Sequence, residues 1–261
     1  MAPGKARMSA QLPLSFDALL DLLVPDRCLG CRRSRCGYRA TCGLCRRCFA
    51  QLRKPPRPAC AGCGLPFAAS VGATVRHCGL CLAEPPAFDR LLALWEYRPP
   101  LDRVIRGLKF HRLDYLGAEL AGEIADQLEA ELDEVDLVTP IPLHWLRRWA
   151  RGFNQAERIA RPLASRFGLP FAQVLARRRS TKAQTSLARG ARLAGPRGAF
   201  GVSLPGLVRE RRILLVDDVA TTGSTLREAA AALARAGARS VVALAVALTP
   251  PAGGGSGTVL R

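Results

Sequence analysis

Short apolar runs alternate with amphipathic segments from about residue 88 to residue 249. Residues 212–216 (Arg-Ile-Leu-Leu-Val) are an apolar run typical of a buried parallel strand, and the alanine-rich residues 225–236 favour a helix. The same patterns predict further strands over residues 88–97, 136–141, 171–175 and 240–248, and further helices over residues 101–110, 115–132 and 156–167. Alternation of this sort predicts an α/β fold with a parallel sheet, in which ligands bind at the carboxyl ends of the strands.

The segments outside this region have a different character. Ser15 can cap a short amphipathic helix over residues 16–23, and the proline-containing residues 82–87 mark a boundary. We therefore expect an N-terminal amphipathic helix within residues 1–27, a small cysteine-rich module over residues 28–82, an α/β domain over residues 88–249, and a disordered tail over residues 250–261.

Hydropathy also bears on location. No apolar run reaches the roughly 18 residues that a membrane-spanning helix needs, so we expect no membrane insertion. The apolar residues 12–24 are interrupted by Asp17 and Asp21 and lack a cleavage-site pattern, which argues against a secretory signal. We therefore expect a soluble protein of the cytoplasm.

All ten cysteines lie between positions 28 and 81, and eight of them form four Cys-x-x-Cys pairs. Two such turns on opposing hairpins present four thiolates in the tetrahedron that zinc prefers, so the spacing predicts two zinc ribbons in tandem. A disulfide framework and a set of buried, small apolar cysteines are the alternatives, and the first of these needs an oxidising compartment. The predicted ligands are Cys28, Cys31, Cys45 and Cys48 for one ion, and Cys60, Cys63, Cys78 and Cys81 for the other.

Two cysteines, Cys36 and Cys42, fall outside this pairing, and a pairing of Cys42 with Cys45 stays open on spacing alone. The small module holds few large apolar side chains, so the metal must supply stability that a core this small cannot. Four thiolates leave no open coordination position, and we therefore expect both zinc ions to be structural.

An acidic pair, Asp217 and Asp218, follows the strand over residues 212–216 and precedes a loop of small and hydroxyl residues that leads into a helix. The free N–H groups of a first helical turn favour a phosphate, and Gly223 allows close backbone approach. A ribose 5-phosphate fits both features, because its hydroxyls can donate to the carboxylates, directly or through metal-bound water. The alternative is a buried strand that ends in an N-capped helix.

The ten residues 216–225 (Val-Asp-Asp-Val-Ala-Thr-Thr-Gly-Ser-Thr) resemble the phosphoribosyl pyrophosphate (PRPP) signature of type I phosphoribosyltransferases. No G-x-x-x-x-G-K-[ST] or G-x-G-x-x-G motif competes with it. On this interpretation Asp217 and Asp218 hold the ribose, with Mg²⁺ accompanying PRPP. The 5-phosphate loop comprises Val219, Ala220, Thr221, Thr222, Gly223, Ser224 and Thr225.

Two other loops are suited to the pyrophosphate. The strand over residues 136–141 ends in Pro140 and Ile141 and runs into Arg147, Arg148 and Arg151, and guanidinium groups bind phosphate in a bidentate manner. A solvated arginine-rich helix face is the alternative, above all for Arg148. The basic, polar residues 177–187, which include Lys182 and Gln184, can fold over a bound pyrophosphate.

The whole pattern resembles the ComF family, which includes ComFC and GntX-like proteins. The resemblance covers residues 16 to about 249 and is carried by the paired Cys-x-x-Cys turns, Leu108-Lys109-Phe110, Pro140-Ile141-Pro142, Arg151-Gly152-Phe153-Asn154-Gln155, Thr181-x-x-Gln184-x-x-Leu187, Gly198-Ala199-Phe200 and the PRPP loop. It implies a double zinc ribbon fused to a phosphoribosyltransferase domain, and a role in handling single-stranded DNA during natural transformation, with a competence helicase as a partner. GntX-like members imply a link to gluconate or DNA utilisation.

The formal net charge of +18 favours a polyanionic partner, and basic residues concentrate on the cysteine-rich module. No residue identifies an acceptor for a ribosyl group. Two hypotheses therefore remain open: a PRPP-binding protein that also holds single-stranded DNA, and an active phosphoribosyltransferase of nucleotide or gluconate-linked metabolism with no DNA role.

Overall fold

The computed structural model describes residues 27–33, 41–67, 76–110, 113–132, 134–143, 152–177 and 198–249. Several predicted features lie outside these residues: the helix over residues 16–23, the tail over residues 250–261, Cys36, and the loop residues Arg147, Arg148, Arg151, Lys182 and Gln184.

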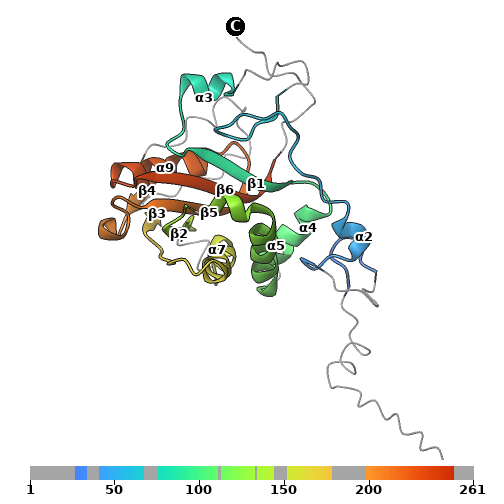
Figure 1. Cartoon of the computed structure of the whole chain (residues 1–261). Coiled ribbons are helices and arrows are strands. Elements are labelled where there is room, and N and C mark those ends of the chain that lie inside the picture. Colours follow the sequence, from blue (N-terminus) through green and yellow to red (C-terminus); the bar gives the residue numbers. More distant parts are fainter. Residues whose placement is uncertain are drawn as a thin grey trace, which may run out of the picture.

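A four-stranded parallel sheet forms the centre of the molecule (Figure 1). Its strands are β1 (Arg90–Glu96), β2 (Leu137–Pro140), β5 (Arg212–Ala220) and β6 (Ser240–Leu248), in the order β1-β6-β5-β2. The central strands β5 and β6 are buried on both faces, which explains their nearly continuous apolar sequence. The α/β fold with a parallel sheet is therefore confirmed.

Helices cover both faces of this sheet (Figure 1). On one face, α4 (Leu101–Phe110), α5 (Tyr115–Leu132) and α7 (Gln155–Arg166) pack with Leu214 and Val216 of β5 in one core. On the other face, α9 (Ser224–Arg235) packs with Ile213 and Leu215 in a second core. The alternation of β5 side chains between the two cores follows from the two-residue period of a strand.

The chain between α7 and β5 differs from the prediction. Phe171 makes only an isolated bridge to Val138, and the strand predicted over residues 171–175 is replaced by β3 (Leu175–Arg177). β3 pairs antiparallel with β4 (Phe200–Val202), and a 3-10 turn, η1 (Pro205–Leu207), follows. The apolar run over residues 171–175 predicts a strand of the main sheet, but strand pairing depends on a distant partner that local periodicity does not reveal.

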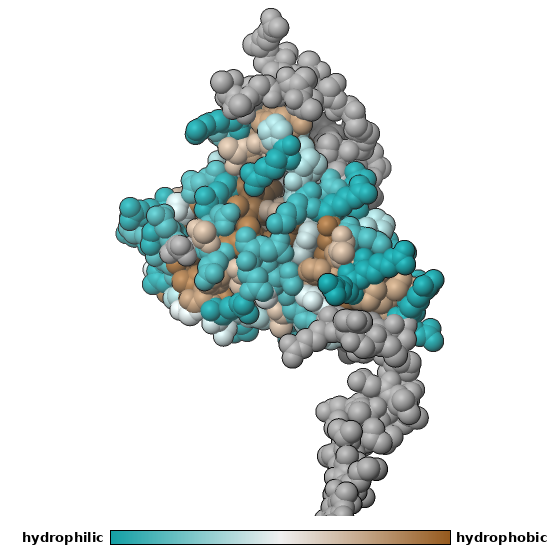
Figure 2. Space-filling model, turned by 45° about the vertical axis from the view of Figure 1, so that its right-hand side comes forward, coloured by the Kyte–Doolittle hydropathy of each residue, from teal (hydrophilic) through white to brown (hydrophobic). Residues whose placement is uncertain are grey.

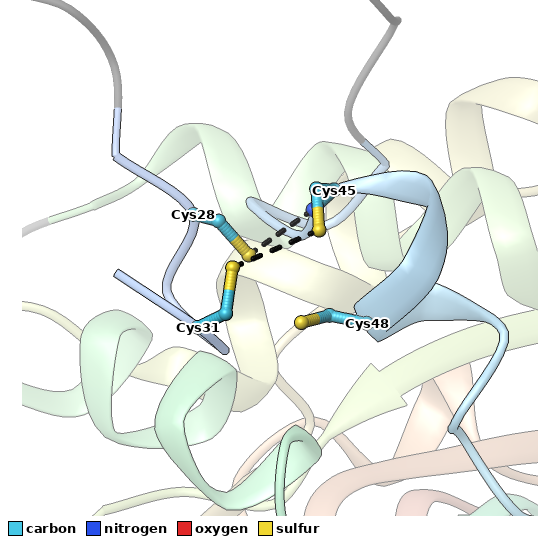
Figure 3. Close-up of side chains that lie close together, drawn as sticks. All are labelled: Cys28, Cys31, Cys45 and Cys48. Atoms are coloured by element: carbon cyan, nitrogen blue, oxygen red, sulfur yellow. Dashed lines mark hydrogen bonds between the residues drawn. The ribbon is translucent and has the colours of Figure 1, made fainter. Parts of the chain in front are cut away.

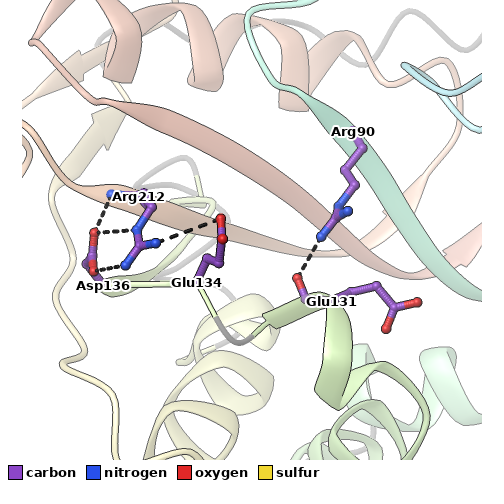
Figure 4. Close-up of polar contacts among 5 residues, drawn as sticks. All are labelled: Arg90, Glu131, Glu134, Asp136 and Arg212. Carbon is purple, nitrogen blue, oxygen red and sulfur yellow. Dashed lines mark hydrogen bonds and ion pairs between the residues drawn. The ribbon is translucent and has the colours of Figure 1, made fainter.

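An ion pair fixes the amino ends of β2 and β5 (Figure 4). The backbone N–H and Nε of Arg212 donate to Oδ2 of Asp136 at 2.8 and 3.1 Å, and Nη2 donates to Oδ1 at 3.0 Å. On the same side of the sheet, Nη2 of Arg90 donates to the carbonyl of Glu131 at 2.8 Å. These contacts lie at the strand ends opposite those predicted to bind a ligand.

The first cysteine-rich segment, which carries α2 (Arg46–Phe49), packs directly on the α/β domain. Cys28, Cys42, Leu44 and Cys48 belong to the same core as α4 and α5. The backbone N–H of Gly43 donates to Oε2 of Glu119 on α5 at 3.0 Å.

The second cysteine-rich segment carries α3 (Gly79–Ala83) and lies against the start of β1. The backbone N–H of Leu91 donates to the carbonyl of Gly62 at 2.9 Å. Throughout the part of the chain that the structure describes, no helix combines the length and apolar character needed to cross a membrane.

Candidate functional site

The acidic pair lies within the second half of β5, and not after the strand as the sequence suggested. The backbone N–H of Asp218 donates to Oδ1 of Asp217 at 2.9 Å, and that of Val219 donates to Oδ1 of Asp218 at 3.0 Å. Asp218 is only 4% exposed, and its Oδ2 lies 2.5 Å from Nζ of Lys109 at the end of α4. A cation from a distant helix thus neutralises one of the two carboxylates.

The other carboxyl group of the pair, that of Asp217, has a raised pKa. Desolvation, with added repulsion from Asp218, raises the pKa of Asp217 from 3.8 to about 8. A cation that approached Asp217 would stabilise its ionised form and so lower its pKa. The pair can therefore accept additional positive charge, or hydroxyl donors, beyond that supplied by Lys109.

The predicted phosphate loop connects β5 to α9. Ala220 ends the strand, and Gly223 adopts a left-handed backbone conformation (φ 71°) immediately before Ser224 begins the helix. A Cβ atom built on Gly223 meets no atom of the described residues within 4 Å, so among these residues open space lies in front of the loop. Gly223 has no side chain that could cap α9, but Oγ1 of Thr222 accepts from the N–H of Ser224 at 3.4 Å and donates to Oγ of Ser224 at 3.1 Å. The other backbone N–H groups of the first turn and the Ser224 hydroxyl can therefore donate to a phosphate in this space.

The neighbouring strand brings Pro140 and Ile141 to the same edge of the sheet. Pro140 ends β2, and the backbone N–H of Ile141 donates to the carbonyl of Val216 at 2.8 Å. The buried Asn154 donates through Nδ2 to the carbonyl of Ile141 at 2.9 Å and accepts from the N–H of Ala156 at 3.1 Å. Asn154 thus fixes the path of the loop residues on both sides of residues 144–151, a role that its sequence motif alone did not reveal.

Two buried polar atoms next to this edge have no hydrogen-bond partner among the described residues. They are Oε1 of Gln155, in the first turn of α7, and Oγ1 of Thr249, one residue beyond β6. Buried polar atoms are normally satisfied, so unpartnered ones at the ligand-binding edge of a parallel sheet fit a polar ligand. Sequence reasoning assigned neither residue to the site, nor Lys109, which it noted only as part of a family motif.

The structure brings the eight Cys-x-x-Cys cysteines together in two groups of four. Within each group, all four sulfur atoms lie within 4.8 Å of one another. Zinc–sulfur bonds of about 2.3 Å in a tetrahedron place the sulfurs about 3.8 Å apart. The Sγ atoms of Cys31 and Cys45 are 3.9 Å apart (Figure 3), and those of Cys63 and Cys78 are 3.6 Å apart. Both groups therefore fit a zinc ion.

Hydrogen bonds orient the sulfur atoms of both groups. The backbone N–H of Cys45 donates to Sγ of Cys28 at 3.2 Å, and that of Cys78 donates to Sγ of Cys60 at 3.3 Å. Such N–H···S bonds favour the thiolate form that binds metal.

Cys42 does not belong to either four-cysteine group. It is fully buried in the core that joins the first cysteine-rich segment to α4 and α5. Burial, together with the negative charges of Glu123 and Glu119, raises the pKa of its thiol well above the usual range. A buried, protonated thiol packs as a small apolar side chain.

Comparison with known families agrees with both halves of the chain. Residues 19–82 match the double zinc ribbon domain, and residues 154–256 match the phosphoribosyl transferase domain. The chain is 34% identical to the DNA utilization protein YhgH of Salmonella typhi, over 84% of this chain and 96% of that protein. It is 30% identical to competence protein F of Haemophilus influenzae, over 82% of this chain and 93% of that protein. The chain belongs to the ComF family.

Solved structures are similar to about half of this ComF-family chain. A glutamine PRPP amidotransferase from B. subtilis is 26% identical with a TM-score of 0.33, over 50% of this chain and 25% of that chain. This chain thus spans about a quarter of the amidotransferase's length. A purine phosphoribosyltransferase from Pyrococcus horikoshii is 16% identical with a TM-score of 0.31, over 52% of this chain and 85% of that chain.

Proposed function

We propose that this ComF-family chain binds PRPP together with Mg²⁺ at the carboxyl ends of β5 and β2. One observation carries the proposal: an acidic pair at the end of a buried parallel strand directly precedes a left-handed glycine loop that faces open space and leads into a helix. Residues 219–225 would cradle the 5-phosphate, and Asp217 and Asp218 would accept hydrogen bonds from the ribose hydroxyls.

The pyrophosphate would lie toward β2. Pro140 and Ile141 reach that side of the site, and Arg147 and Arg151 follow them in the sequence. We assign the pyrophosphate to these residues and to the loop that carries Lys182 and Gln184. Mg²⁺ would arrive with PRPP and neutralise part of its charge.

Isothermal titration of the zinc-loaded protein with PRPP and Mg²⁺ tests this site. We expect the double variant D217N/D218N, which keeps the shape of both side chains, to lose binding. Asp89 is exposed at the opposite end of the sheet, so D89N is a control for a lost carboxylate and should bind as the wild type does. Binding unchanged in the double variant would refute the assignment.

We propose further that the basic surface of the first zinc ribbon holds single-stranded DNA. A cleft of about 530 Å³ beside the first cysteine group is lined by Arg33, Arg47 and Arg103, and also by Gln51 and Pro100. Four thiolates leave two excess negative charges on a zinc ion, and three guanidinium groups outweigh them. Figure 2 shows hydrophilic residues over much of the coloured part of the visible face, with apolar patches between them.

The cleft is tested by the affinity of a fluorescent oligothymidine for the protein at several salt concentrations. R33Q/R47Q should weaken binding and flatten its salt dependence, because fewer counterions are released. The control R235Q/R239Q removes the same charge from exposed arginines at the far end of α9 and the turn beyond it. Equal losses in both double variants would mean that net charge, and not this cleft, binds the oligonucleotide.

These two sites support a role in handling internalised DNA in the cytoplasm during natural transformation, where a helicase would be a partner. An active phosphoribosyltransferase is the alternative, and pyrophosphate release from PRPP with a panel of bases, with and without oligothymidine, separates the two. Release that depends on a base would favour the enzyme, whereas salt-sensitive DNA binding without release would favour the binding protein.

A further inference from the structure

Arg227 connects the candidate phosphate loop to the second cysteine group. It lies in the first turn of α9, where its backbone N–H donates to the carbonyl of Gly223 at 2.9 Å and closes that turn. Its side chain extends to the second cysteine group. Nη2 donates to Sγ of Cys81 at 2.9 Å, and Nη1 donates to the carbonyl of Glu84 at 2.8 Å.

Cys81 is a much stronger acceptor for a guanidinium as a thiolate than as a thiol. It is 3% exposed and belongs to the second four-cysteine group, which fits a zinc ion. A zinc-bound cysteine is a thiolate, and an N–H donated to it by a cation is a charge-assisted hydrogen bond. The Nε atom of Arg227 is buried and has no hydrogen-bond partner among the described residues, so the negative cluster also offsets the desolvation of this cation.

The second cysteine group is itself fixed to the sheet. The carbonyl of Gly62 accepts from the N–H of Leu91 at the start of β1, and a Cβ atom built on Gly64 would lie 3.6 Å from Leu248 at the end of β6. The second cysteine group is therefore attached to the sheet through β1 and β6. Arg227 connects the second cysteine group to α9, the helix that begins at the phosphate loop.

We propose that the second zinc cluster sets the affinity of the 5-phosphate loop through Arg227. With zinc bound, the Cys81 thiolate holds the guanidinium, and the guanidinium holds the first turn of α9 with its N–H groups directed at the phosphate. Arg227 is a positioning residue, because its side chain points at Cys81 and Glu84 and not into the loop. This inference rests on the proposed PRPP site.

The test compares R227M with R235M, which makes the same chemical change at an exposed position in the last turn of the same helix. Ribose 5-phosphate and PRPP both carry the 5-phosphate, so R227M should weaken both by about tenfold, the loss expected for one charge-assisted hydrogen bond. R235M should match the wild type. R227K keeps the charge but cannot span two acceptors, so it should fall between R227M and the wild type.

A spectroscopic readout reports the contact directly. In protein whose zinc has been exchanged for Co²⁺, the thiolate-to-cobalt absorption should shift in R227M and stay unchanged in R235M, because only Arg227 donates to a ligand sulfur. A merely structural role in packing α9 would lower the unfolding temperature without moving that absorption.

The results of these binding experiments distinguish a failure of the proposed PRPP site from a failure of the role proposed for Arg227. Wild-type protein that binds neither ligand would overturn the proposed PRPP site and this inference with it. Wild-type protein that binds both ligands, with R227M and R227K of unchanged affinity, would overturn this inference alone. If R227M fails to fold, R227K serves in its place. An unchanged affinity and an unchanged cobalt spectrum of R227K would then overturn this inference.

Discussion

Nζ of Lys109 lies 2.5 Å from Oδ2 of Asp218, so a side chain from α4 neutralises the acid at the centre of the candidate site. The two residues are far apart in the sequence, and both are largely shielded, with 21% and 6% of their side chains exposed. A ribose that binds to Asp218 must share this carboxylate with Lys109 or displace it. Lys109 would then be free to meet the negative charge of the phosphates.

Breaking this pair should destabilise the protein. K109M leaves Asp218 as a shielded carboxylate without its cation, and we expect it to lower the free energy of unfolding by roughly 2 kcal/mol, less than for a fully buried pair because Lys109 is partly exposed. Adding D218N should recover part of the loss, since the uncompensated charge is removed. Urea unfolding of the two single variants and the double variant measures this coupling, and additive losses would contradict it.

The acidic pair also predicts a pH dependence. The folded-state pKa of Asp217 is raised from 3.8 to about 8, so the folded protein binds a proton that the unfolded chain releases between these values. Stability should therefore fall as pH rises through this window, and D217N should remove that part of the dependence. Thermal unfolding of both proteins at acidic and mildly alkaline pH checks the sign. A wild-type curve parallel to that of D217N would contradict the raised pKa.

The ion pair at the opposite end of β5 predicts the reverse sign. Hydrogen bonds from Arg212 lower the pKa of Asp136 from 3.8 to about 2. The stabilisation is present above pH 3.8 and is lost as pH falls through about 2. D136N should lower the unfolding temperature at neutral pH but make no difference in strong acid. An equal effect at both pH values would mean that the pair acts through packing and not through charge.

Metal content distinguishes the cysteines. C28S should reduce bound zinc from two ions per chain to one, because Cys28 belongs to a four-sulfur group. C42S should leave two ions bound, because Cys42 lies outside both groups, although a buried hydroxyl should lower the unfolding temperature. Zinc per chain, measured by elemental analysis of the purified variants, decides between these outcomes. A loss of one zinc ion in C42S would instead support the alternative in which Cys42 pairs with Cys45 to bind zinc.

Local sequence was sufficient for much of the fold. The bounds of α4, α5 and β6 agree with the periodicity of their apolar residues, because each buries one helical face or lies wholly inside the sheet. β3 and β4 could not be predicted in this way. Their pairing joins residues 175–177 to residues 200–202, and no local pattern specifies so distant a partner.

The same limit applies to the candidate site. Asp217, Asp218 and Gly223 lie close together in the sequence, along one strand and loop, so their sequence motif contains most of their geometry. Lys109 and Arg227 are different, because each matters through a contact with a residue more than a hundred positions away. Only the packing of α4 and α9 on the sheet creates those contacts.

The core that joins Cys28, Cys42, Leu44 and Cys48 to α4 and α5 also has an evolutionary consequence. A zinc ribbon that buries its own side chains can be exchanged between proteins as an independent cassette. Here each half completes the interior of the other, so a recombinant that inherited the cysteine-rich half from a distant relative would place mismatched side chains against α4 and α5. Substitutions on the two sides of this interior are therefore expected to occur together across the family.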